Sequence, residues 1–360
     1  MSSHDQFLQI ISGDRTGAMA AVVRAILRSF SWLYGWVTLL RNACFRTGLK
    51  KTIRVDVPVI SLGNITTGGT GKTPLVAAVV RILQELGHRP GIVSRGYGAD
   101  SSGTNDELRV LEHLCPGVPH VQDADRVAAA RSAIRQHDAD VIVLDDGMQH
   151  RRIHRDLNIV LIDATNPFGY DALLPRGLLR ESLSGLGRAD VIIITRCDQV
   201  SRTQLAETRR RLQQQAPHIG QDLFEVSFQP TKLLDRESQA VSLSDVDGRS
   251  VMVVTAIGNP QGFVATCHSA GANVACTRFF PDHYHYTAND LDSVWKEAAR
   301  NSVSIILTTV KDFVKIRPLL PPWTVEDQPN VLAVEISTVF NPVTSDQRLA
   351  AIIGAAVSPQ

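Results

Sequence analysis

The sequence VDVPVISLGNITTGGTGKTPLVAAVVRILQEL, residues 55–86, decides the fold. Its run from Pro58 to Leu62 is apolar and uncharged, which predicts a buried strand. Apolar residues then recur at helical spacing from Leu75 to Leu86, and Gly87 ends the pattern. A strand, a glycine-rich loop and a helix therefore follow one another, as they do at the start of a nucleotide-binding α/β fold.

The loop between this strand and helix has the composition of a phosphate cradle. Its glycines let successive backbone amides face one point, and the helix N-terminus adds positive charge. A lysine supplies a full charge, and a threonine hydroxyl is available to Mg²⁺. We therefore predict a nucleotide-phosphate site at Gly68, Gly69, Thr70, Gly71, Lys72 and Thr73. The strict pattern G-x-x-x-x-G-K-[ST] needs glycine where this chain has Thr66.

Composition places the chain among ordinary globular proteins. A length of 360 residues predicts two domains, and a net charge of +1 indicates no nucleic-acid partner. The five cysteines are odd in number and never in C-x-x-C spacing, which argues against a disulfide framework or a zinc site and fits a reducing cytoplasm. We recognise no signal peptide, and nothing indicates an obligate protein partner.

After the loop, apolar runs and helical patterns alternate along the chain. This alternation predicts an α/β fold, a P-loop kinase-like parallel sheet with helices on both faces. Residues 100–123 are expected to be irregular. The expected strands are 91–94, 141–144, 157–162 and 191–194, and the expected helices are 125–136 and 201–215.

A polar stretch at 230–247 predicts a linker to a second, smaller α/β domain. Strands are expected there near 251–255, 274–279 and 304–309. We expect an N-terminal membrane-associating helix within 1–50, a nucleotide-binding core at 51–230, and a C-terminal domain at 231–360 that closes over the site.

The segment from Ala18 to Cys44 predicts an amphipathic helix, preceded by sixteen polar residues expected to be loose. Only twelve uncharged residues separate Arg28 from Arg41, fewer than the roughly 20 that span a bilayer. Two tryptophans and the basic residues that follow favour a helix lying in a membrane surface. A helix whose apolar face packs on its own domain is the alternative, and both stay open. The apolar stripe is Val23, Ile26, Leu27, Phe30, Leu33, Tyr34, Val37 and Leu40; the opposite stripe is Arg24, Arg28, Ser31, Gly35, Thr38 and Arg41.

The run VIVLDDGMQH, residues 141–150, carries the second strong signal. A hydrophobic strand that delivers a carboxylate opposite a glycine phosphate loop is how such enzymes hold Mg²⁺. Either Asp145 or Asp146 could bind the ion, directly or through water.

Further polar residues follow other expected strands, where ligands of open parallel sheets bind. Arg95, Arg176 and Arg180 are candidates for phosphate or substrate contacts, with Arg180 placed to reach the transferring phosphoryl group. The run FPDHYHY at 280–286 could indicate a metal site or a histidine that activates a hydroxyl. The candidate substrate contacts are Asn64, Arg95, Tyr97, Gln149 and His150.

Other classes of nucleotide-binding protein carry different residues at the glycine loop and at the base site. Partitioning and cell-division ATPases carry a lysine where this chain has Thr67. A guanine-specific site would need Asn-Lys-x-Asp, whereas residues 195–198 read Thr-Arg-Cys-Asp. Adenine is therefore favoured over guanine.

The motifs in order are GNITTGGTGKTP, SRGYG, NDE, DDGMQH, LPRGLLRE, FPDHYHY and TTVKDFVK. Over roughly residues 20–320 this order resembles the tetraacyldisaccharide 4′-kinases of the lipid A pathway, whose loop also lacks the first strict glycine and which begin with a membrane-associating helix. The resemblance implies that ATP phosphorylates the 4′-hydroxyl of a lipid-linked glucosamine disaccharide 1-phosphate, giving lipid IVA.

The resemblance also implies roles for particular residues. Asp106 and His283 would form an acid–base dyad, and Asp145 with Asp146 would serve Mg·ATP. Arg180 and Glu181 would lie at the phosphate and metal. Two departures affect this transfer: the usual G-D-E-P is Asn105-Asp106-Glu107-Leu108 here, and the usual T-E-K-D is Thr309-Val310-Lys311-Asp312.

The implied cofactors are ATP and Mg²⁺, and the implied partner is the lipid A disaccharide precursor at the cytoplasmic face of the inner membrane. Two alternatives stay open from the sequence: a membrane-surface switch ATPase of the partitioning and cell-division type, and a kinase of the same fold that acts on a soluble sugar.

Overall fold

A computed structural model of the chain describes residues 3–96, 106–282, 284–320, 328–343 and 345–358, with side chains from residue 6 onward. Contacts divide the chain into two compact units, and two long strands contribute residues to both. Unit 1 holds residues 1–98, 114–227 and 340–360, and unit 2 holds residues 99–113 and 228–339.

The sheet of unit 1 confirms the predicted α/β class. Its strands run in the order β7-β6-β5-β1-β4-β2-β3, and neighbouring strands are parallel. Every residue of β1, β2, β4 and β6 is buried, as expected for apolar strands covered on both faces. The strands are β1 (Val59–Asn64), β2 (Pro90–Ser94), β3 (His120–Gln122), β4 (Val141–Asp145), β5 (Leu157–Asp163), β6 (Val191–Thr195) and β7 (Leu223–Leu234).

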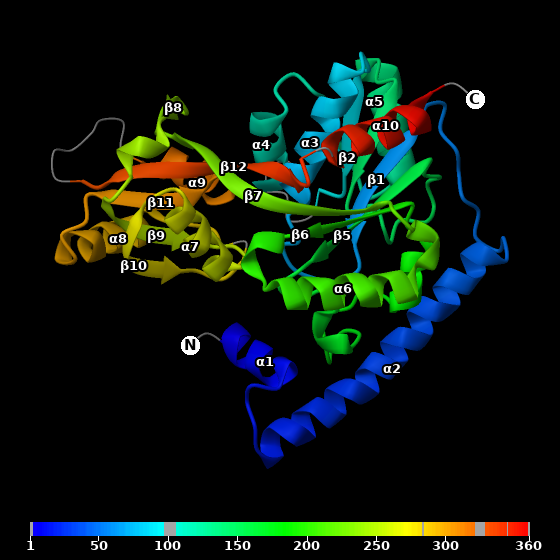
Figure 1. The fold of residues 1–360 in the computed structure, drawn as a ribbon, viewed down its shortest axis with the longest axis horizontal. Coiled ribbons are helices and arrows are strands. Elements are labelled where there is room, and N and C mark those ends of the chain that lie inside the picture. The colour runs from blue at the N-terminus through cyan, green and yellow to red at the C-terminus, as the bar shows by residue number, and fades with distance from the viewer. Residues whose placement is uncertain (1–2, 97–105, 283, 321–327, 344, 359–360) are drawn as a thin grey trace. The chain divides into compact units, whose positions relative to one another are not determined.

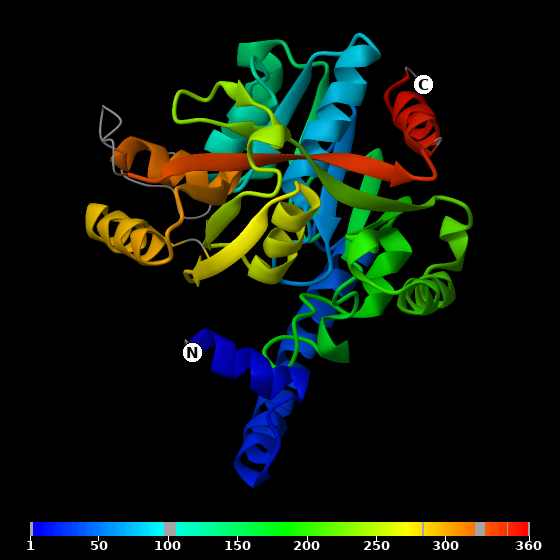
Figure 2. The ribbon, with the colours of Figure 1, turned by 60° about the vertical axis from the view of Figure 1, so that its left-hand side comes forward.

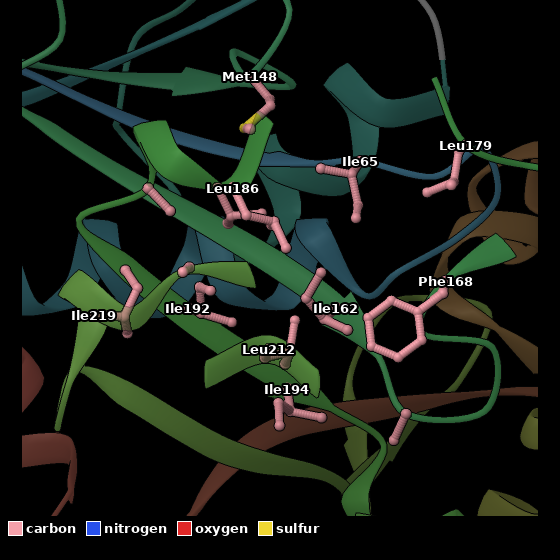
Figure 3. Packing of buried hydrophobic residues seen from close by; sticks show 14 of the residues in the cluster. Ile65, Met148, Ile162, Phe168, Leu179, Leu186, Ile192, Ile194, Leu212 and Ile219 are labelled. Carbon is pink, nitrogen blue, oxygen red and sulfur yellow. The ribbon is translucent and has the colours of Figure 1, made fainter. Parts of the chain in front are cut away.

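Helices of unit 1 begin where the sequence provides caps. The Asp125 carboxylate accepts from the amide of Val127 at the start of α5, and Ser201 forms a capping box with Gln204 at α6. Figure 3 shows Ile162 and Ile194 of β5 and β6 packed near Leu212 of α6. The helices are α1 (Ser3–Ser12), α2 (Ala18–Arg46), α3 (Lys72–Glu85), α5 (Arg126–His137), α6 (Arg202–Gln215) and α10 (Ser345–Val357).

Unit 2 is a second, smaller α/β arrangement. Its parallel strands run β10-β9-β11-β12, and the short β8 pairs antiparallel with β7. Met252 and Val254 of β9 form one core with Leu291 and Val294 of α8. The elements are α4 (Asp106–Leu114), β8 (Ala240–Val241), β9 (Ser250–Thr255), α7 (Pro260–Ser269), β10 (Asn273–Phe279), α8 (Ala288–Arg300), β11 (Ile305–Thr309), α9 (Val310–Ile316) and β12 (Asn330–Asn341).

Several expectations about local structure are wrong. The stretch expected to be irregular contains α4 and β3, because α4 buries Leu108, Val110 and Leu111 despite its short length. The expected linker lies partly in β7 and β8. The N-terminal residues expected to be loose form α1, which packs on α2 and buries Ile11 completely.

The unit assignment also differs from the expected ranges in two segments. Residues 99–113 group with unit 2, and residues 340–360 group with unit 1. Asp106, expected in the nucleotide-binding part, therefore belongs to unit 2. The C-terminal helix α10 packs against α3, which explains why the end of the chain returns to unit 1.

Helix α2 presents two different sides. Ser31 is 5% exposed, and Tyr34 and Gly35 are half-buried on the side that contacts the rest of unit 1. Most of the predicted apolar stripe faces away, although Val23, Leu27 and Tyr34 are half-buried, so the interpretation in which the whole stripe packs on its own domain is wrong. Figures 1 and 2 show the start of α2 projecting from the sheet with α1 folded back beside it. The exposed residues include Met19, Val22, Ile26, Phe30, Trp32, Leu33, Trp36, Val37, Leu39 and Leu40.

Within the described ranges, no helix combines the length and the apolar character that crossing a membrane requires.

Candidate active site

Two segments far apart in the sequence meet at the glycine-rich loop. The amide of Thr67 donates to the carbonyl of Leu178 at 2.7 Å, and the amide of Arg180 donates to the carbonyl of Ile65 at 2.7 Å. An antiparallel bridge between Thr66 and Leu179 completes this pairing. The backbone itself therefore carries Arg180 to the end of β1, where the loop begins.

The loop has the conformation that its glycines permit. Gly68 and Gly71 have φ angles of 106° and 79°, a region that side chains with a Cβ disfavour. Added Cβ atoms at Gly68 and Gly69 would meet nothing within 4 Å, so the loop faces open space. The Thr195 hydroxyl anchors the loop by donating to the carbonyl of Thr70 at 3.0 Å. Helix α3 then begins at Lys72, directly after the loop.

The hydroxyl of Thr70 is buried and has no hydrogen-bond partner among the described residues. Such a group in a loop at a helix N-terminus is suited to an oxyanion acceptor or a water that fills the cradle.

A compact charge cluster lies beside the loop. Lys72 Nζ donates to Asn64 Oδ1 at 3.1 Å and lies 3.5 Å from Asp146 Oδ1. The Arg180 guanidinium donates to both carboxylate oxygens of Asp146 at 2.8 Å, which is a bidentate pair. Arg180 also donates to the carbonyl and side-chain oxygens of Asn64. The cluster holds two positive charges against one carboxylate.

These cations decide the ionisation of Asp146. Burial opposes its negative charge, but Lys72 and Arg180 outweigh burial and hold the pKa of this carboxyl far below its usual range. Asp146 is therefore ionised at neutral pH. Its left-handed φ of 54° turns the side chain out of the strand direction of β4.

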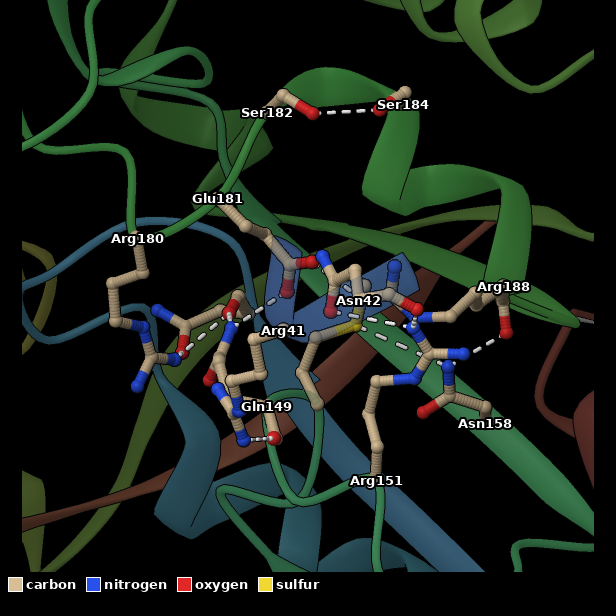
Figure 4. A network of polar contacts seen from close by, with 12 residues as sticks. Arg41, Asn42, Gln149, Arg151, Asn158, Arg180, Glu181, Ser182, Ser184 and Arg188 are labelled. Carbon is tan, nitrogen blue, oxygen red and sulfur yellow. Dashed lines mark hydrogen bonds and ion pairs between the residues drawn. The ribbon is translucent and has the colours of Figure 1, made fainter. Parts of the chain in front are cut away.

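A second network extends this cluster through Gln149 and Glu181. The Gln149 amide donates to the carbonyl of Asn64 at 3.0 Å and to Glu181 Oε1 at 2.9 Å. Glu181 is 4% exposed and forms an ion pair with Arg188 through Oε2. Arg41 of α2 donates to the carbonyl of Gln149, so the N-terminal helix takes part in this network (Figure 4).

Hard oxygen donors for Mg²⁺ are present at the loop. Asp145 is 3% exposed at the carboxyl end of β4, and Thr73 stands in the first turn of α3. The donor set of carboxylate and hydroxyl oxygens fits Mg²⁺ chemically. Asp146 and Glu181 already have cationic partners, and the described part of the chain contains no group of three or more acidic, histidine or cysteine side chains arranged for a metal.

The other predicted residues lie in four different places. His150 lies close to the cluster, where burial and then Arg126 and Arg41 lower its pKa to about 4. Arg95 is exposed after the end of β2. Arg176 lies elsewhere: it donates to the carbonyl of Ile11 at 2.7 Å and serves the N-terminal helices. Tyr97 and His283 lie outside the described residues.

Asp106 opens α4 in unit 2, where its carboxylate lies 3.2 Å from Lys315 Nζ. Lys315 is also 3.4 Å from Asp312, a fully buried carboxylate. Asp312 accepts from the Thr255 hydroxyl at 2.7 Å and from the Ala256 amide at 2.9 Å. This network ties Asp106 to β9 and α9.

The run FPDHYHY packs by its rings in unit 2. The centroids of Phe280 and Tyr284 are 4.7 Å apart, and those of Phe280 and Tyr286 are 5.1 Å apart. Lys315 Nζ lies 5.5 Å from the Tyr286 ring centroid, so this aromatic cluster borders the Asp106 network.

Sequence reasoning missed several residues that hold the site. Tyr34 donates its hydroxyl to the carbonyl of Arg180 at 2.8 Å, but it was assigned only to an apolar stripe. Lys315 lies one helical turn after Lys311, which offered a weak spacing signal. Arg188 and Arg126 carried no motif, because only the fold brings them to Glu181 and toward the acidic pair.

Comparison with known proteins agrees with this geometry. The family model described as Tetraacyldisaccharide-1-P 4′-kinase matches residues 23–354. A tetraacyldisaccharide 4′-kinase of Anaeromyxobacter dehalogenans (strain 2CP-C) is 38% identical over 324 residues, covering 85% of each chain. That of Anaeromyxobacter sp. (strain K) is 35% identical over 364 residues, covering 96% of this chain and 95% of its own.

A solved structure is also similar along most of its length. It is the "apo" form of LpxK from Aquifex aeolicus in complex with ATP, with a TM-score of 0.71 and 27% sequence identity. The match covers 93% of this chain and 100% of that one. The chain therefore belongs to the tetraacyldisaccharide 4′-kinase family, enzymes that phosphorylate the 4′-hydroxyl of the lipid-linked disaccharide in lipid A biosynthesis.

Proposed function

We propose that this enzyme transfers the γ-phosphoryl group of ATP at a membrane surface, using the Lys72–Asp146–Arg180 cluster at the glycine loop. The bidentate Arg180–Asp146 pair is the observation that carries this proposal, because it fixes a guanidinium beside a phosphate cradle. Phosphoryl transfer asks mainly for positioning and for neutralisation of charge.

Each residue of the cluster has a stated role. Loop amides from Gly68 to Thr73, together with Lys72, hold the β- and γ-phosphates. Arg180 stabilises charge on the transferring group, and Asp146 keeps Arg180 and Lys72 oriented. Thr73 and Asp145 would hold Mg²⁺, which neutralises phosphate charge when bound.

Asp106 accepts the proton of the sugar hydroxyl in this proposal, with His283 as its assistant. The Lys315 ammonium holds the Asp106 carboxylate in position through the 3.2 Å ion pair. Since Asp106 belongs to unit 2, the role requires unit 2 to meet the nucleotide during the reaction. Asn64, Gln149, His150, Arg95 and Tyr97 stay candidates for substrate contacts.

The membrane part of the proposal rests on α2. Its exposed apolar residues include Trp32 and Trp36, 70% and 69% exposed, and on its other side Tyr34 donates to the carbonyl of Arg180. Apolar and aromatic side chains on one side of a helix favour burial at a lipid interface. The enzyme would then meet its lipid substrate at the cytoplasmic face of the inner membrane, without a nucleic-acid or obligate protein partner.

Activity is tested with purified protein in detergent micelles, radiolabelled ATP and tetraacyl disaccharide 1-phosphate. Label should appear on the lipid and fall at least about 100-fold with Lys72→Ala or Asp106→Ala. Lys296→Ala, an exposed lysine of α8, is the matched control and keeps activity. Release of free phosphate with unlabelled lipid would contradict the proposal and point to a switch ATPase.

Membrane binding is tested by pelleting with lipid vesicles. Replacing Trp32, Trp36 and Leu40 with serine should release most of the protein, because each apolar side chain contributes about 1.5–3 kcal/mol when fully buried. Leu86→Ser, an exposed leucine outside α2, is the control. Point changes are preferable to deleting α2, which would also remove Tyr34 from the active site. Unchanged pelleting would refute the role of α2.

A further inference from the structure

The motif TTVKDFVK, residues 308–315, spans the end of β11 and most of α9, and only its Lys315 has a role in the proposed function. Another of its residues, Asp312, is a fully buried carboxylate. We propose that Asp312 is a positioning residue for phosphoryl transfer, because it holds Lys315 between Asp106 and the segment that follows His283. The inference rests on the proposed function, where Asp106 and His283 are the acid–base pair.

The Asp312 carboxylate is held by three donors. Its Oδ2 atom accepts from the Thr255 hydroxyl at 2.7 Å and from the Ala256 amide at 2.9 Å, both at the end of β9. It also accepts from the Thr309 hydroxyl at 2.8 Å, and the Asp312 amide donates back to that hydroxyl at 3.0 Å at the start of α9. Three donors to one oxygen leave the carboxylate a single orientation.

The second oxygen of this carboxylate, Oδ1, lies beside Lys315. Oδ1 is buried, has no hydrogen-bond partner among the described residues, and lies 3.4 Å from Lys315 Nζ. A buried carboxylate needs a compensating charge, and this ammonium supplies it. The Lys315 side chain is itself only 6% exposed, so the two charges depend on each other and not on water.

Lys315 Nζ meets two further acceptors, which belong to the segments of the proposed acid–base pair. It lies 3.2 Å from Asp106 Oδ2 at the start of α4, and it donates to the carbonyl of Tyr284 at 3.1 Å. Tyr284 follows His283 in the sequence. The three N–H donors of one ammonium therefore match one acceptor on each of three segments. The place of Lys315 thus decides how α4 lies against residues 284–286.

Two carboxylates, Asp106 and Asp312, share the single ammonium of Lys315. The ring of Tyr286 also lies near it, and this side chain is neutral because burial, Asp312 and Asp290 raise the pKa of its hydroxyl far above the ordinary value. The negative charge of Asp312 therefore offsets the ammonium and raises the affinity of Asp106 for a proton. A carboxylate that takes up a proton more readily is a better acceptor for the proton of a sugar hydroxyl.

Other charged groups near this network occur in pairs of opposite sign. Glu107 and Arg109 follow Asp106 on α4, and Lys311 of α9 lies 3.0 Å from Asp282. Because the charges within each pair oppose each other, the shared ammonium and the buried carboxylate behind it dominate the field at the proposed proton acceptor.

Asp312→Asn tests this role in the full-length enzyme, with the lipid-labelling assay in micelles repeated across a range of pH. The variant keeps the size of the side chain and removes its charge. We expect kcat to fall about 10-fold, and the acid limb of the pH profile of kcat to move about one unit toward lower pH. KM for ATP should stay unchanged, because no residue of the network belongs to the glycine loop. Asp312→Glu keeps the charge and should keep the acid limb in place.

Asp292→Asn is the matched control, because Asp292 is an exposed aspartate of α8 in the same unit. It should keep both kcat and the acid limb. A lower kcat with an unmoved acid limb in Asp312→Asn would overturn the inference, since damage to the fold alone lowers kcat alike at every pH. An unchanged kcat and acid limb would overturn it as well.

A measurement on the wild-type protein covers the case in which Asp312→Asn does not fold, and it does not depend on kinase activity. In ¹H–¹⁵N correlation spectra of enzyme labelled with ¹⁵N-lysine, the Lys315 ammonium should give a resolved signal, because burial and three acceptors slow its exchange with water. Lys315→Met identifies the signal by its loss. Asp106→Asn should shift the signal, and Asp292→Asn should not.

The two measurements separate this inference from the proposed function. Labelled lipid without a Lys315 signal, or with a signal that Asp106→Asn leaves in place, rejects the network and keeps the kinase. A signal that responds to Asp106→Asn, together with unlabelled lipid, confirms the contacts of the network and rejects the proposed function on which its catalytic role rests.

Discussion

At the scale of single residues, the active site depends on how one arginine meets one carboxylate. Arg180 reaches Asp146 with two parallel hydrogen bonds of 2.8 Å, a geometry that the planar guanidinium allows and an ammonium does not. Lys72 approaches the same carboxylate from the helix at 3.5 Å. Both cations are then fixed before a phosphate arrives, which is what electrostatic stabilisation of a transition state requires.

Replacing Arg180 by lysine tests this geometry. Arg180→Lys keeps the charge but loses the bidentate pair, so we expect kcat to fall about 10- to 100-fold with a smaller change in KM for ATP. Initial rates at varied ATP measure both quantities. Arg210→Lys, which alters an exposed pair with Glu207 on α6, should leave the rate unchanged. An unaffected kcat in Arg180→Lys would mean that charge alone suffices.

Lys315 tests the positioning of Asp106. Lys315→Met removes the ammonium 3.2 Å from Asp106 while keeping the bulk, so kcat should fall about 10-fold or more. The double variant Lys315→Met, Asp106→Ala should lose little more kcat than Asp106→Ala alone, because the two residues act as one unit. Lys311→Met, which alters the 3.0 Å pair with Asp282, is the comparison. Losses in kcat that add fully in the double variant would show that Lys315 and Asp106 act independently.

At the scale of elements, backbone contacts decide where the loops lie. The 178–180 segment pairs with 65–67, and α2 bonds to that segment through Tyr34 and to residues 173–176 through Ser31. The Ser31 hydroxyl donates to the carbonyl of Leu173 at 2.8 Å and accepts from the Arg176 amide at 3.0 Å. A helix that presents apolar residues outward is thus attached by its small and polar side.

Removing the Tyr34 hydroxyl tests the coupling between α2 and the active site. Tyr34→Phe loses the 2.8 Å hydrogen bond to the Arg180 carbonyl, and a neutral hydrogen bond contributes about 0.5–1.5 kcal/mol. We expect kcat to fall about 2- to 10-fold in micelles. Trp36→Phe on the exposed side of α2 should leave kcat in micelles unchanged. Equal kcat values for Tyr34→Phe and the wild type would show that this hydrogen bond from α2 does not contribute to catalysis.

Gly63 tests the contact between β1 and the turn that follows β4. A Cβ at this position would lie 2.6 Å from the backbone nitrogen of Met148, a contact that backbone movement alone can relieve. Gly63→Ala should lower the free energy of unfolding by about 1–3 kcal/mol, measured by urea denaturation. Gly187→Ala, where a Cβ meets nothing within 4 Å, should be nearly neutral. Equal urea midpoints for Gly63→Ala and Gly187→Ala would show that the turn after β4 moves to accommodate the added methyl group.

At the scale of the whole molecule, two histidines make stability depend on pH. Burial lowers the pKa of His120 to about 4, and burial with nearby arginines lowers that of His150 equally. Between their ordinary value of 6.5 and about 4, the unfolded chain binds more protons than the folded chain. The free energy of unfolding therefore decreases as the pH falls through this range.

His120 offers the cleaner test of this dependence, because it lies away from the charge cluster and bonds to Ser94 at 2.8 Å. At about 1.4 kcal/mol per pKa unit, its full effect reaches about 3 kcal/mol. His120→Gln should reduce the loss of stability between pH 7 and pH 5, measured by urea denaturation at each pH. His137→Gln, an exposed histidine at the end of α5, should not. Parallel curves for His120→Gln and the wild type would refute the assignment.

The local sequence determined those elements that it marks with uncharged apolar runs or with several glycines. Uncharged apolar runs fix β1, β4, β5 and β6, since such runs have no stable alternative to burial, and the glycines that allow positive φ fix the loop before α3. The order of motifs also determined the family, because several phosphate-site motifs in one sequence order are specific. The short elements α4 and β3 and the long strand β12 lacked such signals and were missed or assigned to loops.

Tertiary structure alone decided how the side chains meet. Arg180 comes to Asp146 and Lys315 to Asp106 because segments distant in sequence pack together. The same packing turned Ser31 of α2 inward and most of the apolar stripe outward, a choice that periodicity cannot make since it gives the stripe and not its direction. An amphipathic pattern defines the two faces of a helix. Only the neighbouring backbone and its hydrogen bonds determine which of those faces packs against the protein.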